Sequence, residues 1–211
     1  MKDDLFIKTI TVGPLSVNCY ILGCNKSKRC AIIDPGAEKT KIIEGVNASG
    51  YQPELNMLTH GHIDHVAAVA PLKRQYELKV ALHKDDIRLL NAPDIFGLGP
   101  ILGAEPCPEP DMVLNDGKVI NIGNLEISIL HTPGHTPGSC CFYINNHCFC
   151  GDTVFEGSVG RTDLPGSDFN ILMRSIKTKI LSLDDHTILL PGHGPTTSVG
   201  IEREGNPFFP R

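Results

Sequence analysis

The chain contains no tryptophan, and only 6% of its 211 residues are aromatic. Its four tyrosines are scattered, so the sequence predicts no aromatic wall for a substrate pocket. An excess of positive charge is also missing, because 24 Asp and Glu outnumber 19 Lys and Arg and give a formal net charge of −5. Binding to phosphate backbones or anionic lipids needs a basic surface. The charge balance therefore disfavours nucleic acids and membranes as partners.

Long apolar runs are absent as well. The N-terminal segment Met1–Lys8 is rich in charge, and no run approaches the length of a signal-peptide core or a membrane span. We therefore expect a cytoplasmic protein. No low-complexity stretch or linker divides the chain, and 41% hydrophobic residues suffice for a sizeable core, so we expect a single domain over residues 1–211.

The eight cysteines show neither the regular spacing of a secreted disulfide framework nor a Cys-x-x-Cys pair. We expect them to stay reduced, and a structural zinc site built from thiolates has little support. Cys148 and Cys150 are two residues apart in an apolar run, so they share one strand face as small buried hydrophobes.

Apolar periodicity predicts an α/β chain with two similar halves. The first half is predicted to form strands over Leu5–Val12, Val17–Leu22, Cys30–Asp34, Leu55–Thr59 and Lys79–Leu82, and helices over Ala37–Ala48, Val66–Tyr76 and Lys84–Leu90. The second half is predicted to form strands over Val119–Ile122, Leu125–His131, Ser139–Ile144, His147–Cys150 and Thr187–Leu190, and a helix over Phe169–Leu181. Two β-rich halves, each shielded by helices, predict a four-layer αββα sandwich. Between the halves, Asn91–Pro110 is rich in proline and glycine without periodicity, which is typical of a lid or of a disordered surface tip.

Histidines cluster at the end of the predicted strand Leu55–Thr59. If the chain stays extended there, His60, His62 and Asp64 point to one side and His65 points elsewhere. Imidazole and carboxylate groups suit zinc, iron or manganese, and four such ligands do not fit one tetrahedral ion, so the spacing suggests two adjacent metals. The alternative is a polar loop in which Asp64 caps the helix that begins near Val66.

Three further candidates follow predicted strands elsewhere in the chain: His135, Asp152 and His193. Strand ends from both halves can converge on one edge of a sandwich, and a carboxylate such as Asp152 has two oxygens with which to bridge two cations.

These motifs resemble the signature of the metallo-β-lactamase fold hydrolases. The segments Ile33–Gly36, Thr132–Thr136, Gly151–Thr153, Gly160–Asp163 and Pro191–Pro195 resemble those of the glyoxalase II branch. The resemblance implies the αββα sandwich of that family and two divalent metal ions, zinc in the first place and iron or manganese as alternatives. By position, it implies a first metal held by His60, His62 and His135, a second held by Asp64, His65 and His193, and Asp152 as a bridge.

The activity that the resemblance implies is hydrolysis of a small thioester such as S-lactoylglutathione by a metal-bound hydroxide, with Asp64 and Asp152 as catalytic residues. A divalent ion lowers the pKa of bound water from about 15.7 to about 7 and polarises a carbonyl, which is what this reaction needs. Only eighteen residues follow His193, so the chain resembles the short form of the branch, without the helical region that contributes to glutathione binding in the longer enzymes. The thiol and acyl parts of the substrate therefore stay open.

Other residues have two interpretations each. Asp34, Thr59 and Thr136 either hold ligand imidazoles in one tautomer or serve ordinary turns and caps. Arg161 either binds a substrate carboxylate or pairs with Asp163. The histidines outside the signature are expected to be satisfied or exposed, and they are His83, His131, His147 and His186.

Two other functions compete with a thioesterase. An iron persulfide dioxygenase of the same fold would use His60, His135 and Asp152 as a facial triad. A non-enzymatic, zinc-stabilised binding protein would use the ligands as a closed structural site. β-Lactamases of the family are exported and lack an aspartate at the bridging position, and relatives that cut RNA are disfavoured by the acidic balance. The sequence carries no signal for the oligomeric state.

Overall fold

The computed structural model describes residues 4–90, 92, 94 and 96–209. Its first mixed sheet has the order β1-β2-β3-β4-β5-β6 and comprises β1 (Leu5–Val12), β2 (Val17–Cys24), β3 (Arg29–Ile33), β4 (Gln52–Met57), β5 (Lys79–His83) and β6 (Met112–Leu114). The second mixed sheet has the order β14-β13-β10-β9-β8-β7 and comprises β7 (Val119–Ile122), β8 (Leu125–His131), β9 (Cys140–Ile144), β10 (His147–Gly151), β13 (Ile188–Pro191) and β14 (Thr197–Ser198). A separate hairpin pairs β11 (Val154–Phe155) with β12 (Ser158–Val159).

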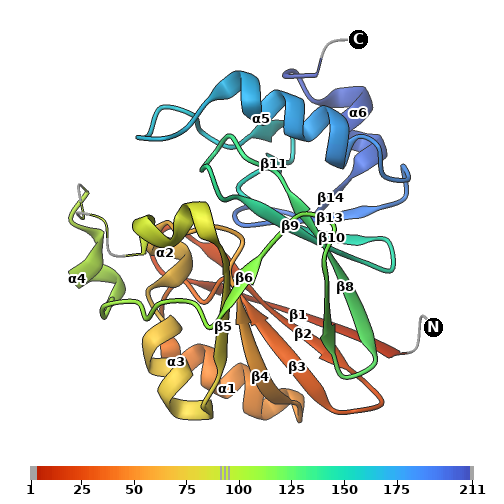
Figure 1. Ribbon diagram of the computed structural model, residues 1–211. Coiled ribbons are helices and arrows are strands. Elements are labelled where there is room, and N and C mark those ends of the chain that lie inside the picture. The colour runs from red at the N-terminus through yellow and green to blue at the C-terminus, as the bar shows by residue number, and fades with distance from the viewer. Residues whose placement is uncertain (1–3, 91, 93, 95, 210–211) are drawn as a thin grey trace.

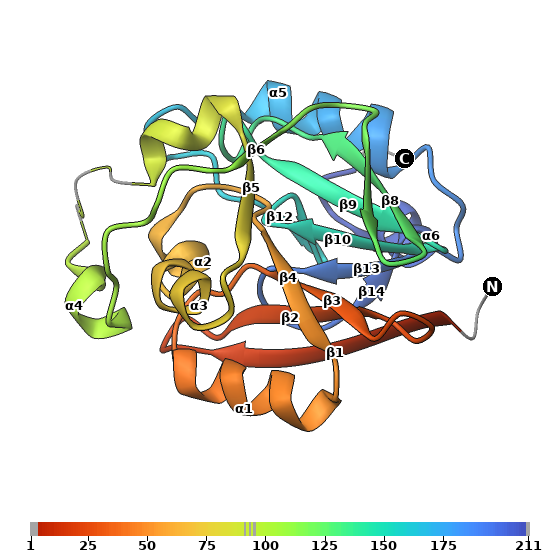
Figure 2. The same cartoon turned by 60° about the horizontal axis from the view of Figure 1, so that its bottom comes forward.

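Helices cover the outer face of each sheet (Figures 1 and 2). The first sheet is covered by α1 (Lys39–Ser49) and α3 (Val69–Tyr76), which pack Val46 and Leu72 against it. The second is covered by α5 (Phe169–Ser175), the π-helical turn η3 (Ile176–Ile180) and α6 (Val199–Gly205). The predicted four-layer αββα sandwich is thus confirmed.

Strand β2 shows why the layers stack in this order. All eight of its residues are buried, because successive side chains enter two different cores. Tyr20 and Leu22 point into the core between the sheets, where the Tyr20 ring meets Phe149 edge-on with ring centroids 5.1 Å apart. Ile21 points to the opposite face and packs with Ile42 of α1. A strand covered on both faces reads as a continuous apolar run, as this one does.

Two predicted helices differ from the structure. The helix expected over Val66–Tyr76 begins three residues later, as α3, and a separate short helix, α2 (Ile63–Val66), precedes it. The two are separate because the Ala68 N–H donates to the Pro35 carbonyl (2.9 Å) rather than continuing α2. The helix expected over Lys84–Leu90 is a 3₁₀ helix, η2 (Lys84–Leu89).

Of the segment Asn91–Pro110, residues 91, 93 and 95 lie outside the described residues. The remainder contains a helix that was not predicted, α4 (Leu98–Leu102). It forms because the Asp94 carboxylate accepts hydrogen bonds from the N–H groups of Leu98 (2.9 Å) and Gly99 (2.6 Å) at its start. The role of this segment as a lid stays a prediction.

The described part of the chain bears on two further expectations. None of its helices is long and apolar enough to cross a lipid bilayer. Its eight cysteines are all buried and no disulfide joins them. Cys148 and Cys150 share the core beneath α5, as their spacing predicted.

Gly36 is where the first sheet meets α2. A Cβ atom at this position would lie 1.8 Å from the Asp64 carbonyl oxygen, so only glycine fits without moving the helix. We expect Gly36→Ala to lower the free energy of unfolding by about 1–3 kcal/mol, as overpacking does. Urea denaturation would measure this change, with Gly205→Ala as control, because a Cβ there meets no atom within 4 Å beyond its chain neighbours and its own helix backbone. Equal stability of the two variants would contradict the argument.

Candidate metal centre

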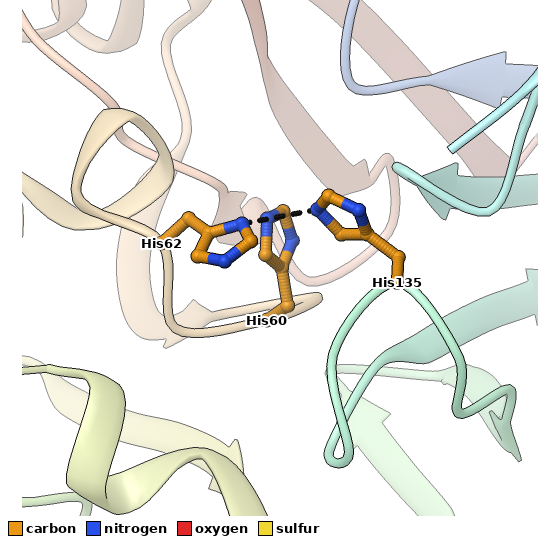
Figure 3. Close-up of side chains that lie close together, drawn as sticks. All are labelled: His60, His62 and His135. Atoms are coloured by element: carbon orange, nitrogen blue, oxygen red, sulfur yellow. Dashed lines mark hydrogen bonds between the residues drawn. The ribbon is translucent and has the colours of Figure 1, made fainter. Parts of the chain in front are cut away.

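The seven predicted ligands lie together where the ends of strands from both sheets meet. His60 follows β4, and His62 immediately precedes α2. The three other loops contribute one ligand each: His135 lies in the turn between β8 and β9, Asp152 follows β10 and His193 follows β13. Figure 3 shows His60, His62 and His135 pointing toward one another from two different loops.

The ligand atoms form two groups of three. In the first, one nitrogen each from His60, His62 and His135 lie within 4.8 Å of one another, and His62 Nδ1 is 3.0 Å from His135 Nε2. In the second, Asp64, His65 and His193 meet the same limit, and the two histidine Nε2 atoms are 3.3 Å apart.

Asp152 lies between the two groups. Its Oδ1 is 3.3 Å from Nε2 of His65, and its Oδ2 is 3.6 Å from Nε2 of His135 and 3.7 Å from Nε2 of His193. One carboxylate thus reaches both groups, which is the placement that a bridging ligand needs.

The sequence predicted an extended chain from His60 to His65, and this prediction holds only as far as His62. Helix α2 begins at Ile63, so Asp64 and His65 lie in a helical turn, and His65 points into the centre rather than elsewhere. Asp64 is not the cap of a helix starting near Val66, because it lies inside the first turn of α2.

Backbone carbonyl groups fix the orientation of two imidazoles. His135 Nδ1–H donates to the Arg161 carbonyl and His193 Nδ1–H donates to the Leu15 carbonyl, each at 2.9 Å. A carbonyl oxygen only accepts, so Nδ1 carries the proton in both rings. Nε2 of each ring is then left with its lone pair directed into the centre.

The buried carboxylate of Asp34 fixes the orientation of the His65 imidazole. Asp34 Oδ1 accepts from the Thr59 N–H (2.8 Å), and Oδ2 accepts from the Thr59 hydroxyl (2.6 Å) and from His65 Nδ1–H (3.0 Å). Since the hydroxyl hydrogen is used by Asp34, the Thr59 oxygen accepts from His60 Nδ1–H at 3.1 Å. Asp34 and Thr59 therefore hold two candidate ligand imidazoles in the tautomer that directs Nε2 inward.

The residues fit a bound divalent cation. Among the described residues, the buried atoms His60 Nε2 and Asp152 Oδ1 have no hydrogen-bond partner, although such atoms are nearly always satisfied. Ligand nitrogens on one tetrahedral zinc lie about 3.3 Å apart, given Zn–N bonds of about 2.0–2.1 Å, and the nitrogen pairs here are 3.0 and 3.3 Å apart. The donor set of imidazoles and carboxylates suits zinc, iron or manganese.

Burial and neighbouring charges prepare these groups for a cation. Burial lowers the pKa of His60 well below its usual value and lowers the pKa of His62 to about 4. Burial acts to raise the pKa of Asp152, but the imidazoles of His65, His60 and His135 together outweigh it, and the pKa lies well below the usual range. Burial acts to lower the pKa of His65, but the carboxylates of Asp152 and Asp64 raise it well above its usual value. A cation bound here would displace the His65 proton, so metal affinity would fall as pH decreases.

We expect Asp34→Ala to weaken metal binding by about 10–100-fold, the usual effect of removing a group that orients ligands. The variant loses the acceptor that holds His65 and Thr59. Competition with a chelator of known affinity would measure the change. Glu54→Ala, which removes a half-exposed carboxylate paired with Arg29 on the protein surface, is the matched control. Unchanged affinity in the Asp34 variant would show that the ligands are oriented without it.

Two predicted auxiliary residues make other contacts. The Thr136 hydroxyl donates to Asp86 Oδ2 (2.7 Å), and among the described residues it bonds no imidazole. The Arg161 guanidinium pairs with Asp163 through two N–O contacts of 2.8 Å, which is the alternative interpretation of this residue. A role for Arg161 in substrate binding stays a prediction.

Sequence reasoning missed the residues that hold the turn carrying His193. The Asn18 side-chain amide donates to the carbonyls of Pro191 (3.1 Å) and Gly194 (2.9 Å), and the Tyr20 hydroxyl donates to Pro191 (2.7 Å). About 170 residues separate these partners, and no local pattern signals such contacts.

His83, Asp85 and His131 form another group with ligand atoms within 4.8 Å. The two rings are stacked, with centroids 4.0 Å apart and planes at 14°. Because the lone pair of an imidazole nitrogen lies in the ring plane, nearly parallel stacked rings do not direct both lone pairs at one ion. His131 Nε2–H also donates to the Pro137 carbonyl (2.9 Å), in keeping with the expectation of satisfied histidines.

Known proteins resemble this chain along nearly its whole length. The sequence profile of the Metallo-beta-lactamase superfamily matches residues 12–193. The chain is 37% identical over 206 residues to the probable metallo-hydrolase YqgX of Bacillus subtilis, with 96% of each chain covered. It is 36% identical over 211 residues to the hydroxyacylglutathione hydrolase GloC of Haemophilus influenzae, with 96% of this chain and 97% of that one covered.

Solved structures agree with these matches. The BLEG-1 B3 metallo-beta-lactamase superposes with a TM-score of 0.89 at 36% identity, covering 98% of this chain and 100% of that one. TTHA1623 in a di-iron-bound form superposes with a TM-score of 0.85 at 38% identity, covering 96% and 100%. By profile, sequence and structure, the chain belongs to the metallo-β-lactamase superfamily.

Proposed function

We propose that this protein is a binuclear metal-dependent hydrolase that cleaves a small thioester, S-lactoylglutathione or a related compound. The observation that carries the proposal is the convergence of seven groups whose imidazole nitrogens and carboxylate oxygens face one another in two sets joined by Asp152. The similarity to the Haemophilus influenzae protein named hydroxyacylglutathione hydrolase supports a thioester as the substrate.

The centre is closed on one side and open on the other, as a catalytic site requires. His60 and His65 are at most 1% exposed, whereas the side chains of Asp64 and His193 are 15% and 27% exposed. A structural metal site has all positions filled by protein, while a catalytic site keeps one for water or substrate. The exposed side therefore favours an enzyme over a zinc-stabilised binding protein.

The residues of the centre have different roles in the proposed hydrolysis. Divalent ions held here would lower the pKa of water to about 7 and polarise the thioester carbonyl. Asp64, the more exposed of the two carboxylates, accepts a hydrogen bond from the attacking water and orients it toward the substrate. Asp152, whose oxygens lie near histidines of both groups, would help to hold both ions, and the backbone contacts of His135 and His193 keep their rings in place.

Metal analysis of the purified protein together with a substrate panel tests this function. Protein loaded with zinc, iron or manganese would be given S-lactoylglutathione, with thiol release followed by a thiol reagent. Glutathione persulfide, with oxygen uptake as readout, tests an iron dioxygenase. A β-lactam tests the reaction suggested by the name of BLEG-1. We expect two ions per chain and thiol release; oxygen uptake or β-lactam cleavage without thiol release would overturn the proposal.

A further inference from the structure

Asp86 is a fully buried carboxylate in η2 that belongs to neither group of candidate ligands. Its Oδ2 accepts from the Gly61 N–H (3.0 Å) and the Thr136 hydroxyl (2.7 Å). Its Oδ1 accepts from the Gly138 N–H (2.7 Å). Both oxygens are thus occupied by donors of the protein, so Asp86 serves as an acceptor rather than a metal ligand.

The three donors come from the two loops that carry the first group of histidines. Gly61 lies between His60 and His62, and Thr136 directly follows His135. These loops belong to different sheets, since the first follows β4 and the second joins β8 to β9. One carboxylate therefore sets the distance between imidazoles that are distant in the sequence.

The approach of both loops to Asp86 is as close as glycine permits. A Cβ on Gly138 would lie 2.6 Å from Asp86 Cγ, and a Cβ on Gly61 would lie 2.8 Å from the Asp86 carbonyl oxygen. No side chain separates either backbone from η2, so a change at Asp86 is transmitted directly to the ligand loops.

We propose that Asp86 is a positioning residue that sets the separation of His60 and His62 from His135 and thereby the affinity of the first metal position. The proposal rests on the assignment of these three histidines as ligands. Metal ions bind tightly only where ligand atoms are held close to the required geometry, and groups that orient ligands commonly contribute about 10–100-fold in affinity. Among the described residues, Asp86 forms no hydrogen bond with the side chains of the second position, which are Asp64, His65 and His193.

Asp86→Asn is the sharpest variant because it keeps the shape and changes one acceptor into a donor. If the amide nitrogen replaces Oδ1 it faces the Gly138 N–H, and if it replaces Oδ2 it faces the Gly61 N–H. Either orientation sets two donors against each other and pushes one loop away. Thr136→Val is a milder variant that removes a single hydrogen bond. Asp85→Asn is the matched control, since the neighbouring carboxylate is 47% exposed.

Zinc titration of the metal-free proteins, with a chelator as competitor and the melting temperature measured alongside, tests the proposal. We expect two zinc ions per wild-type chain, and in Asp86→Asn one of the two bound about 10–100-fold more weakly while the other keeps its affinity. Thr136→Val should shift the same ion by a smaller factor, and Asp85→Asn should match wild type. A merely structural role would lower the melting temperature without separating the two affinities, and that result would overturn the proposal. A wild-type chain that takes up no zinc would instead overturn the ligand assignment itself.

Discussion

Asp152→Ala is expected to abolish both metal uptake and turnover. The variant removes a carboxylate that lies 3.3 Å from His65 of one ligand group and 3.6 Å from His135 of the other. Orienting groups alone contribute about 10–100-fold, so we expect the rate to fall by more than about 100-fold when a shared ligand is lost. Metal content by atomic emission and the initial rate of thiol release would measure the two effects, and His62→Ala should behave in the same way.

Asp163→Ala is the matched control for that experiment. It removes an exposed carboxylate paired with Arg161, outside the centre, and should leave the metal content unchanged. An Asp152 variant that is both active and fully loaded would refute the ligand assignment. A variant that keeps one ion and loses activity would show that Asp152 supports one position more than the other.

Removal of the metal should leave the protein folded but inactive. The hydrophobic core between the sheets is built from residues such as Leu22, Phe142 and Phe149, and none of the seven candidate ligands belongs to it. Without a cation, Asp152 is ionised, because its pKa is lowered, and His65 is protonated, because its pKa is raised. The two opposite charges compensate each other in the centre. Loss of a ligand present at about 1,000 times its Kd costs about 4 kcal/mol, which for a chain of this length lowers Tm on the order of 10 °C.

Circular dichroism and activity, measured on the same chelator-treated sample, separate the two roles of a metal. We expect an unchanged far-ultraviolet spectrum at 25 °C, a lower Tm, and activity that returns when zinc, iron or manganese is added. Unfolding on chelation would instead identify a zinc-stabilised structural protein. Retained activity after complete metal removal would contradict hydrolysis at a metal centre.

Local patterns were sufficient for most of the strands and for the candidate ligands. The strand predicted over Leu5–Val12 has these bounds in the structure, because its apolar and turn residues act within a few positions of one another. The helix predicted over Val66–Tyr76 is present and ends at Tyr76, but it begins only at Val69, for the opposite reason. Its break at Ala68 comes from a hydrogen bond to Pro35, a residue of another segment.

The same distinction separates the parts of the centre. Spacing and residue type are properties of one segment. The amino-acid sequence alone was therefore enough to predict five imidazoles and two carboxylates as metal ligands and to place them after strands. The inward turn of His65 on α2 follows from a helix start that the spacing did not reveal. The tautomers imposed by the carbonyls of Leu15 and Arg161, and the hydrogen bonds of Asp86, come from partners 25 to 178 positions away. Such contacts exist because the fold packs loops of the same sheet and of the two different sheets against one another, and no periodicity within a segment encodes which backbone groups that packing brings together.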